Sequence, residues 1–150
     1  MKFSKLTDYS VLILTELSKS DGDSLAASAL AKKSNVPEPT VSKVLKILSR
    51  AGLVKAQRGA QGGYVLSRDI SAISVFDVLI AIEGPLTMTE CASGHDDVSC
   101  SLESICALNG RWGVVNKAIE NTLNNISLAQ LIRPNGKKEF VKLEGQKAYV

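Results

Sequence analysis

The sequence contains little of what most enzymes and secreted proteins need. It has one histidine, His95, and only three cysteines among 150 residues. A single histidine leaves no Ser-His-Asp arrangement to propose, and no phosphate-binding glycine loop of the P-loop or dinucleotide type is present, so we do not expect an enzyme. An odd number of cysteines with no visible secretory signal argues against a disulfide framework.

Long apolar runs are also missing. The longest, residues 11–14 and 78–82, are far shorter than the roughly 20 residues that cross a bilayer. Lys2, Lys5 and Asp8 interrupt the start of the chain, which does not resemble a signal peptide. With 45% hydrophobic and 22% charged residues, the composition excludes a mainly disordered chain. We expect a soluble, cytoplasmic protein with its own hydrophobic core.

The charge is small overall but unevenly distributed. The formal net charge is +3. Residues 1–69 carry 11 lysines and arginines against 6 acids, residues 70–132 carry 2 against 7, and residues 133–150 carry 5 against 2. A basic first half indicates a surface that meets a polyanion, although an ordinary solvated surface would give the same count.

Apolar periodicity predicts three helices in the first third of the chain. Side chains recurring at spacings of three and four indicate a helix over residues 5–18. A second helix is expected over residues 25–33 with Ser24 as its N-cap. A third is expected over residues 38–51, with Gly52 at a left-handed C-terminal cap. This order is typical of a helix-turn-helix unit.

A hairpin is predicted next. Two short β-prone runs, residues 53–56 and 64–67, flank the glycine-rich stretch 57–63. A fourth helix should begin after Ser74, with Asp77 as its capping-box partner. The expected fold class is therefore mainly α with a small β-hairpin, a winged helix-turn-helix.

The composition and the apolar periodicity of the chain change after the fourth predicted helix. Residues 86–105 are rich in Thr, Ser, Asp and Gly and lack a clean period, which predicts a long loop. A helix resumes over residues 111–125 and adds a long C-terminal helix to the fold class. The basic stretch 133–150 is expected to be a flexible tail.

Eight side chains are candidates for contact with DNA. In helix-turn-helix proteins the second helix of the motif lies in the major groove, and basic groups around it hold phosphates. A glycine-rich wing can carry an arginine into a narrow minor groove. The candidates on the third helix and on the hairpin are Glu38, Thr40, Ser42, Lys43, Lys46 and Arg50, followed by Lys55 and Arg58.

The loop contains all three cysteines, Cys91, Cys100 and Cys106, together with His95. Grouped thiolates bind zinc, cuprous copper or an iron–sulfur cluster. The spacing lacks the tight C-x2-C pairs of zinc ribbons. Three close thiols could also act as a metal-free redox switch. The sequence leaves these alternatives open.

The motifs resemble those of the Rrf family of bacterial regulators, which includes IscR, NsrR and the regulators of Suf-type iron–sulfur assembly operons. The resemblance covers the chain to about residue 132. It is carried by the order of elements, by the wing stretch 53–66 with its R-G-x-x-G-G-Y pattern, by residues 74–83, and by three cysteines ahead of a C-terminal helix.

The resemblance implies a homodimer that binds double-stranded DNA and holds an iron–sulfur cluster through Cys91, Cys100 and Cys106. We favour a [2Fe–2S] cluster over a [4Fe–4S] cluster. The histidine that completes the cluster in the IscR branch is replaced here by Asn109. Asp8 matches a partner-subunit ligand of the NsrR branch, and we favour it over His95 as the fourth ligand. A favourable interaction of Asp8 with the helix dipole is the alternative.

The resemblance also suggests a division of the chain and a function. The expected regions are a DNA-binding unit (1–84), a cysteine loop (85–108), a dimerisation helix (109–132) and a basic tail (133–150). The leading hypothesis is a repressor that senses an iron–sulfur cluster and controls iron–sulfur assembly genes. The alternatives are a metal-free thiol-sensing regulator of the same fold and a zinc-stabilised protein-binding adaptor.

Overall fold

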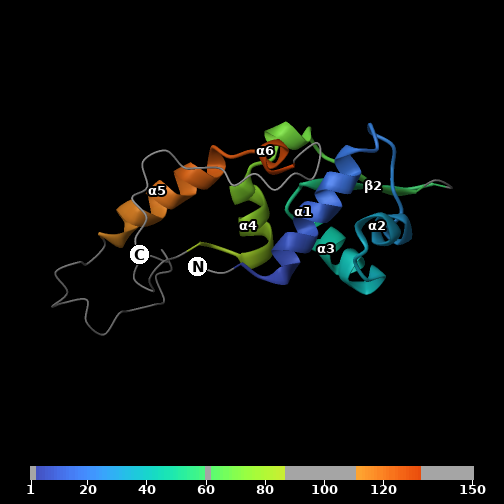
Figure 1. The fold of residues 1–150 in the computed structure, drawn as a ribbon, viewed down its shortest axis with the longest axis horizontal. Coiled ribbons are helices and arrows are strands. Elements are labelled where there is room, and N and C mark those ends of the chain that lie inside the picture. The colour runs from blue at the N-terminus through green and yellow to red at the C-terminus, as the bar shows by residue number, and fades with distance from the viewer. Residues whose placement is uncertain (1–2, 60–61, 87–110, 133–150) are drawn as a thin grey trace.

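This computed structural model describes residues 3–59, 62–86 and 111–132. Three helices are followed by a hairpin and then by further helices (Figure 1). The elements are α1 (Lys5–Ser18), α2 (Ala27–Ser34), α3 (Glu38–Arg50), β1 (Val54–Gln57), β2 (Gly63–Leu66), the 3-10 turn η1 (Ile70–Ala72), α4 (Val75–Glu83), α5 (Trp112–Asn124) and α6 (Leu128–Leu131). The mainly helical arrangement with a small antiparallel hairpin is as predicted. The long C-terminal dimerisation helix of the predicted fold class stays a prediction.

The core is built around α1, which packs against α2, α3 and α4. In Figure 1, α1 lies between α4 on one side and α3 on the other. The periodic apolar positions of these helices converge there, as their spacing predicts. Fully buried members of this core include Ile13, Leu14, Leu30, Val41, Val44, Leu45 and Leu48.

The predicted start of the second helix is wrong. The helix begins at Ala27 with Ala26 as its N-cap, two residues later than expected, and Ser24 is not the cap. Leu25 is extended instead and pairs with Tyr64 of β2 through two backbone hydrogen bonds of 3.0 and 2.9 Å. The backbone groups of Leu25 therefore serve the hairpin and are not available to a helix.

The hairpin is regular and is held against the helices. β1 and β2 are antiparallel, with Val54 opposite Leu66 and Gln57 opposite Gly63. A Cβ on Gly63 would lie 2.6 Å from the carbonyl carbon of Leu25, so only glycine allows this approach. The glycine pattern that suggested turn chemistry thus also reflects close packing of two backbones.

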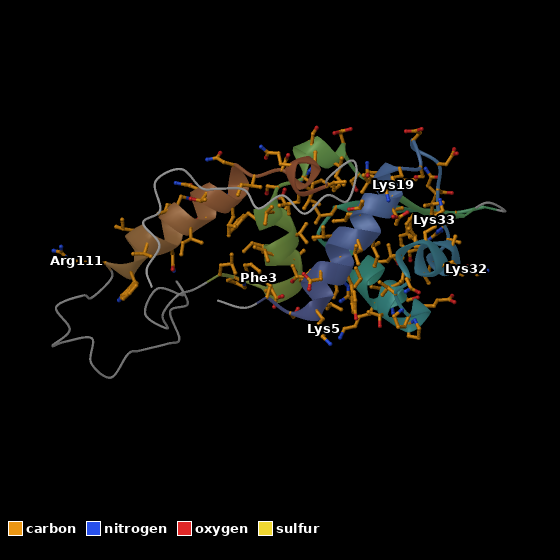
Figure 2. The ribbon with its side chains drawn as sticks, viewed as in Figure 1. Phe3, Lys5, Lys19, Lys32, Lys33 and Arg111 are labelled. Atoms are coloured by element: carbon orange, nitrogen blue, oxygen red, sulfur yellow. The ribbon has the colours of Figure 1, made fainter. Side chains whose placement is uncertain are left out.

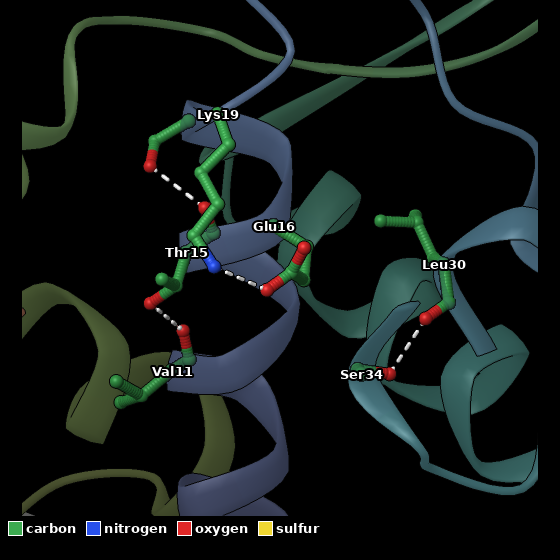
Figure 3. A network of polar contacts seen from close by, with 7 residues as sticks. Val11, Thr15, Glu16, Lys19, Leu30 and Ser34 are labelled. Carbon is green, nitrogen blue, oxygen red and sulfur yellow. Dashed lines mark hydrogen bonds and ion pairs between the residues drawn. The ribbon is translucent and has the colours of Figure 1, made fainter. Parts of the chain in front are cut away.

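The ends of α3 and α4 follow the predicted capping rules. Gly52 adopts φ +71°, as expected for a left-handed residue after a helix. Ser74 and Asp77 form the capping box at the start of α4, and Gly84 ends the helix. Two other hydroxyl groups bond within their own helices (Figure 3): Thr15 donates to the carbonyl of Val11 and Ser34 to the carbonyl of Leu30.

The C-terminal helices differ in how they are held. No residue of α5 is buried, and Val114 is 75% exposed. The four-residue helix α6, which was not predicted, places a fully buried Leu128 in the core. Figure 1 shows α5 at the end of the molecule opposite the hairpin. Within the described ranges, no helix is long and apolar enough to cross a membrane.

Candidate nucleic-acid interface

The turn between α2 and α3 has a defined geometry. Asn35 ends α2 in the left-handed conformation with φ +56°, and Val36 is buried beneath the turn. The carbonyl of Pro37 accepts from the backbone N–H groups of Thr40 and Val41 at 2.9 and 3.0 Å. These contacts fix the direction in which α3 leaves the turn.

Helix α3 has one buried face and one exposed face. Four of its apolar residues, Val41, Val44, Leu45 and Leu48, are fully buried, and this anchors the helix along most of its length. The exposed face displays five of the predicted DNA-contacting side chains, while Thr40 is half-buried. The five are Glu38, Ser42, Lys43, Lys46 and Arg50. A rigid helix that presents short hydroxyls and cations has the composition of a groove-reading helix.

The hairpin adds two more exposed cations. Lys55 lies on β1 opposite Val65, and Arg58 follows directly after the strand. Gly59, the next residue, has φ +131°, a conformation that favours glycine. Both predicted wing residues are therefore exposed on a hairpin whose base is fixed by Leu25.

The cations of this interface have no acidic partners among the described residues. The ion pairs of that part of the chain join Lys19 to Glu16, Arg68 to Asp77, and Lys117 to Glu120. None involves a cation of α3 or of the hairpin. Positive charge that no described acid neutralises is available to a polyanion.

Two further lysines, not among the predicted DNA-contacting residues, lie close to this face. Lys32 and Lys33 are exposed in the last turn of α2, just before the turn into α3. Figure 2 shows them at the end of the molecule from which the hairpin projects. In the sequence, the only indication of DNA contact at these positions is a pair of adjacent lysines at the end of a helix. Such a pair is also common at helix C-termini, where cations interact favourably with the helix dipole.

The proposed metal ligands are only partly within the described structure. Cys91, Cys100, Cys106 and His95 lie outside the described residues, as does Asn109, so their arrangement stays a prediction. Asp8 is described. It lies in the first turn of α1, and its side chain is exposed.

A carboxylate near the end of α4 joins that helix to the start of α1. Oε1 of Glu83 accepts hydrogen bonds from the Ser4 backbone N–H at 2.9 Å, from the Ser4 hydroxyl at 2.7 Å, and from the Thr7 hydroxyl. These bonds, that of Thr7 above all, lower the pKa of Glu83 because they stabilise the charged form. The start of α1, with Asp8, is thereby fixed to the end of α4.

A helix-turn-helix with an anchored hairpin, and with a cationic face that pairs with no acid in the described ranges, defines a winged helix-turn-helix DNA-binding protein. A family model described as "Rrf2: Iron-dependent Transcriptional regulator" matches residues 3–134. The chain belongs to this Rrf2 family of transcriptional regulators. Membership implies that it binds DNA and that it is a regulator rather than an enzyme.

Individual relatives agree with this assignment. The HTH-type transcriptional regulator CymR of Bacillus subtilis is 30% identical over 132 residues, which are 87% of this chain and 89% of CymR. The solved structure of CymR, titled the global cysteine regulator of B. subtilis, has a TM-score of 0.62 at 29% identity, covering 87% of this chain and 95% of that one. T. potens IscR has a TM-score of 0.59 at 30% identity, covering 87% and 85%.

Proposed function

We propose that the protein is a homodimeric transcriptional repressor that senses an iron–sulfur cluster and controls iron–sulfur assembly genes. The observation that carries the proposal is the exposed cationic face of α3 and the hairpin, which forms no ion pair with the rest of the described structure. The chain also matches a family described as iron-dependent along residues 3–134. The similarity to a structure named IscR supports the same function.

On DNA, α3 enters the major groove. Ser42 and Lys43 lie in its N-terminal half and contact base edges or phosphates, while Lys46 and Arg50 contact the DNA backbone. The hairpin places Arg58 toward the neighbouring minor groove, where the potential is most negative. Lys55 adds a phosphate contact, and Glu38 and Thr40 complete the set at the helix start.

The chain has donors suited to a cluster. Thiolates of Cys91, Cys100 and Cys106 are the ligand type that iron–sulfur clusters take. Asp8 is exposed and forms no ion pair within the described part of the chain, so its carboxylate is available as the fourth ligand; His95 is the other candidate. When bound, the cluster supplies a group whose presence depends on iron and oxidants. Its type is proposed as [2Fe–2S].

The dimer is proposed to form through α5. No residue of this helix is buried, and its apolar positions Val114 and Val115 are 75% and 40% exposed. Apolar side chains on an element that projects from the core indicate an interface. A two-fold dimer would place its two reading helices about 34 Å apart along the duplex, one helical turn. The proposal keeps the predicted roles of the three later regions: the cysteine loop (85–108), the dimerisation helix (109–132) and the basic tail (133–150).

The test compares DNA affinity with and without the cluster. The full chain is purified without oxygen and loaded with iron and sulfide, and its visible spectrum is recorded. Its affinity for a duplex selected from a random pool is then measured beside that of metal-free protein and of the Cys91→Ala, Cys100→Ala, Cys106→Ala triple variant. We expect a coloured protein whose affinity differs between the loaded and metal-free forms, and a triple variant that shows no difference. A colourless protein, or equal affinity in every form, would overturn the proposal.

A metal-free thiol sensor is the second candidate. It is favoured by the similarity to CymR, whose structure is titled a cysteine regulator. In that case oxidation at Cys91, Cys100 or Cys106 would change DNA affinity in protein that contains no iron. Mass spectrometry of the oxidised chain together with metal analysis separates the two candidates. The adaptor hypothesis is dropped because the relatives are transcriptional regulators.

A further inference from the structure

The segment before α4 is joined to the connection between α5 and α6. The Val75 N–H donates to the carbonyl of Ile126, and the Leu128 N–H donates to the carbonyl of Ile73, both at 2.8 Å. Ser74 and Ser127 face each other in an antiparallel bridge. Because Ile73 and Leu128 are fully buried on either side of this bridge, the end of α5 has a fixed position against the DNA-binding unit.

Asp77 connects this junction to the hairpin. Its Oδ2 accepts from the Ser74 backbone N–H at 2.9 Å and from Nη2 of Arg68 at 2.7 Å. Arg68 lies two residues after the last residue of β2. The Ser74 hydroxyl donates in turn to Oδ1 of Asn124, the last residue of α5, at 3.4 Å. One carboxylate therefore lies between the base of the hairpin and the end of α5.

Stability alone does not account for the Arg68–Asp77 pair. The two side chains are 44% and 32% exposed, and ion pairs this exposed to solvent contribute little to stability. What the pair does accomplish is geometric, since it links the segment that follows β2 to the first turn of α4, and α4 lies between the hairpin and α5 in Figure 1. A small rotation at the junction would move the hairpin relative to α5.

We infer that Asp77 and Arg68 are positioning residues that set the half-site spacing the regulator accepts on DNA. The inference rests on the dimer proposed above. If two subunits meet through α5, the distance between their reading helices depends on how rigidly each DNA-binding unit is held to that helix. A shift of one base pair, about 3.4 Å along the axis, is enough to place base contacts out of register.

The experiment uses the full chain and three duplexes. One carries the spacing selected from a random pool, and the others carry one base pair more or one fewer between half-sites. Asp77→Asn keeps an oxygen that accepts from Ser74 but removes the charge opposite Arg68. Arg68→Gln removes the same pair from the other side. The matched control is Glu16→Gln, which removes the 2.6 Å pair between Glu16 and Lys19 at the C-terminal end of α1 (Figure 3).

We expect the wild type and Glu16→Gln to lose about tenfold or more in affinity when the spacing changes, since base contacts in one half-site are then lost. Asp77→Asn and Arg68→Gln should lose less than about threefold, with their affinity for the parent duplex nearly unchanged. Sharp spacing in both variants, or a loss that is equal on all three duplexes, overturns the inference and leaves the proposed function intact. A protein that sediments as a monomer on the parent duplex overturns both.

Discussion

Replacing Gly63 by alanine tests how the hairpin is attached to the helices. The Cβ would lie 2.6 and 2.7 Å from the carbonyl carbon and oxygen of Leu25, and 2.9 Å from the nitrogen of Ala26. These are backbone atoms, which cannot rotate away as a side chain can. The strand must move, and the two backbone hydrogen bonds between Leu25 and Tyr64 are lost or lengthened.

The magnitude follows from these contacts. Two backbone hydrogen bonds are worth about 1–3 kcal/mol together, and overpacking adds about 1–3 kcal/mol. The free energy of unfolding should therefore fall by roughly 2–6 kcal/mol, which lowers Tm by on the order of 10 °C for a chain of this size. Thermal unfolding followed by circular dichroism measures the change.

Two other glycines serve as controls for the same substitution. Gly113 lies in α5 with open space around it, so Gly113→Ala should stabilise by about 0.5–1 kcal/mol. Gly52 also has open space but adopts φ +71°, so Gly52→Ala should destabilise by about 1–2 kcal/mol. If Gly63→Ala unfolds at the wild-type temperature, the close approach of Gly63 to Leu25 does not hold the hairpin.

Three further predictions concern the contacts of Glu83 with α1, the buried Leu128 of α6, and the DNA-contacting face of α3. Hydrogen bonds from Thr7 first and from Ser4 second lower the pKa of Glu83. The charged carboxylate therefore stabilises the fold fully above the ordinary glutamate pKa, and this stabilisation is lost as the pH falls through the lowered pKa. The difference in Tm between wild type and Glu83→Gln should therefore shrink across that acid range. Leu128→Ala, at a fully buried position, should destabilise by about 2–5 kcal/mol in urea unfolding. Lys43→Ala should weaken DNA binding and reduce the slope of log K against log salt by about 1, whereas Lys19→Ala, whose cation is paired with Glu16, should change neither.

Sequence patterns predicted the elements that are fixed by local rules. Helix α3 has four buried positions at helical spacing, and α4 has a capping box, so both could be placed from neighbouring residues alone. Helix α6 carried a comparable signal in Ser127 and Gln130, which form a capping box. A helix of four residues is too short to show a recognisable apolar period, so the sequence pattern did not predict it.

The start of α2 could not be predicted in the same way. Ser24 has the chemistry of an N-cap, and the residues after it favour a helix. The competing partner, Tyr64, lies 39 residues further along the chain, and its two hydrogen bonds hold Leu25 extended. A local propensity of a few tenths of a kcal/mol per residue is outweighed by a pair of backbone hydrogen bonds. The prediction of the DNA-contacting residues was affected less by such distant contacts, because the helical period alone decides which side chains of α3 are exposed.

Glu83 shows how a residue can contradict a local rule and satisfy a tertiary one. An acid in the last turn of α4 is unfavourable for the dipole of its own helix. The same carboxylate accepts from the backbone N–H of Ser4, the N-cap residue of α1, whose side chain makes no capping bond. Negative charge is favourable at that helix start, so Glu83 caps a helix 79 residues away in sequence. The bonds from Ser4 and Thr7 to Glu83 therefore hold the helix that carries Asp8 against the end of α4, from which the chain continues toward Cys91. A ligand that contacts both regions would act on two helices whose relative position these bonds already fix.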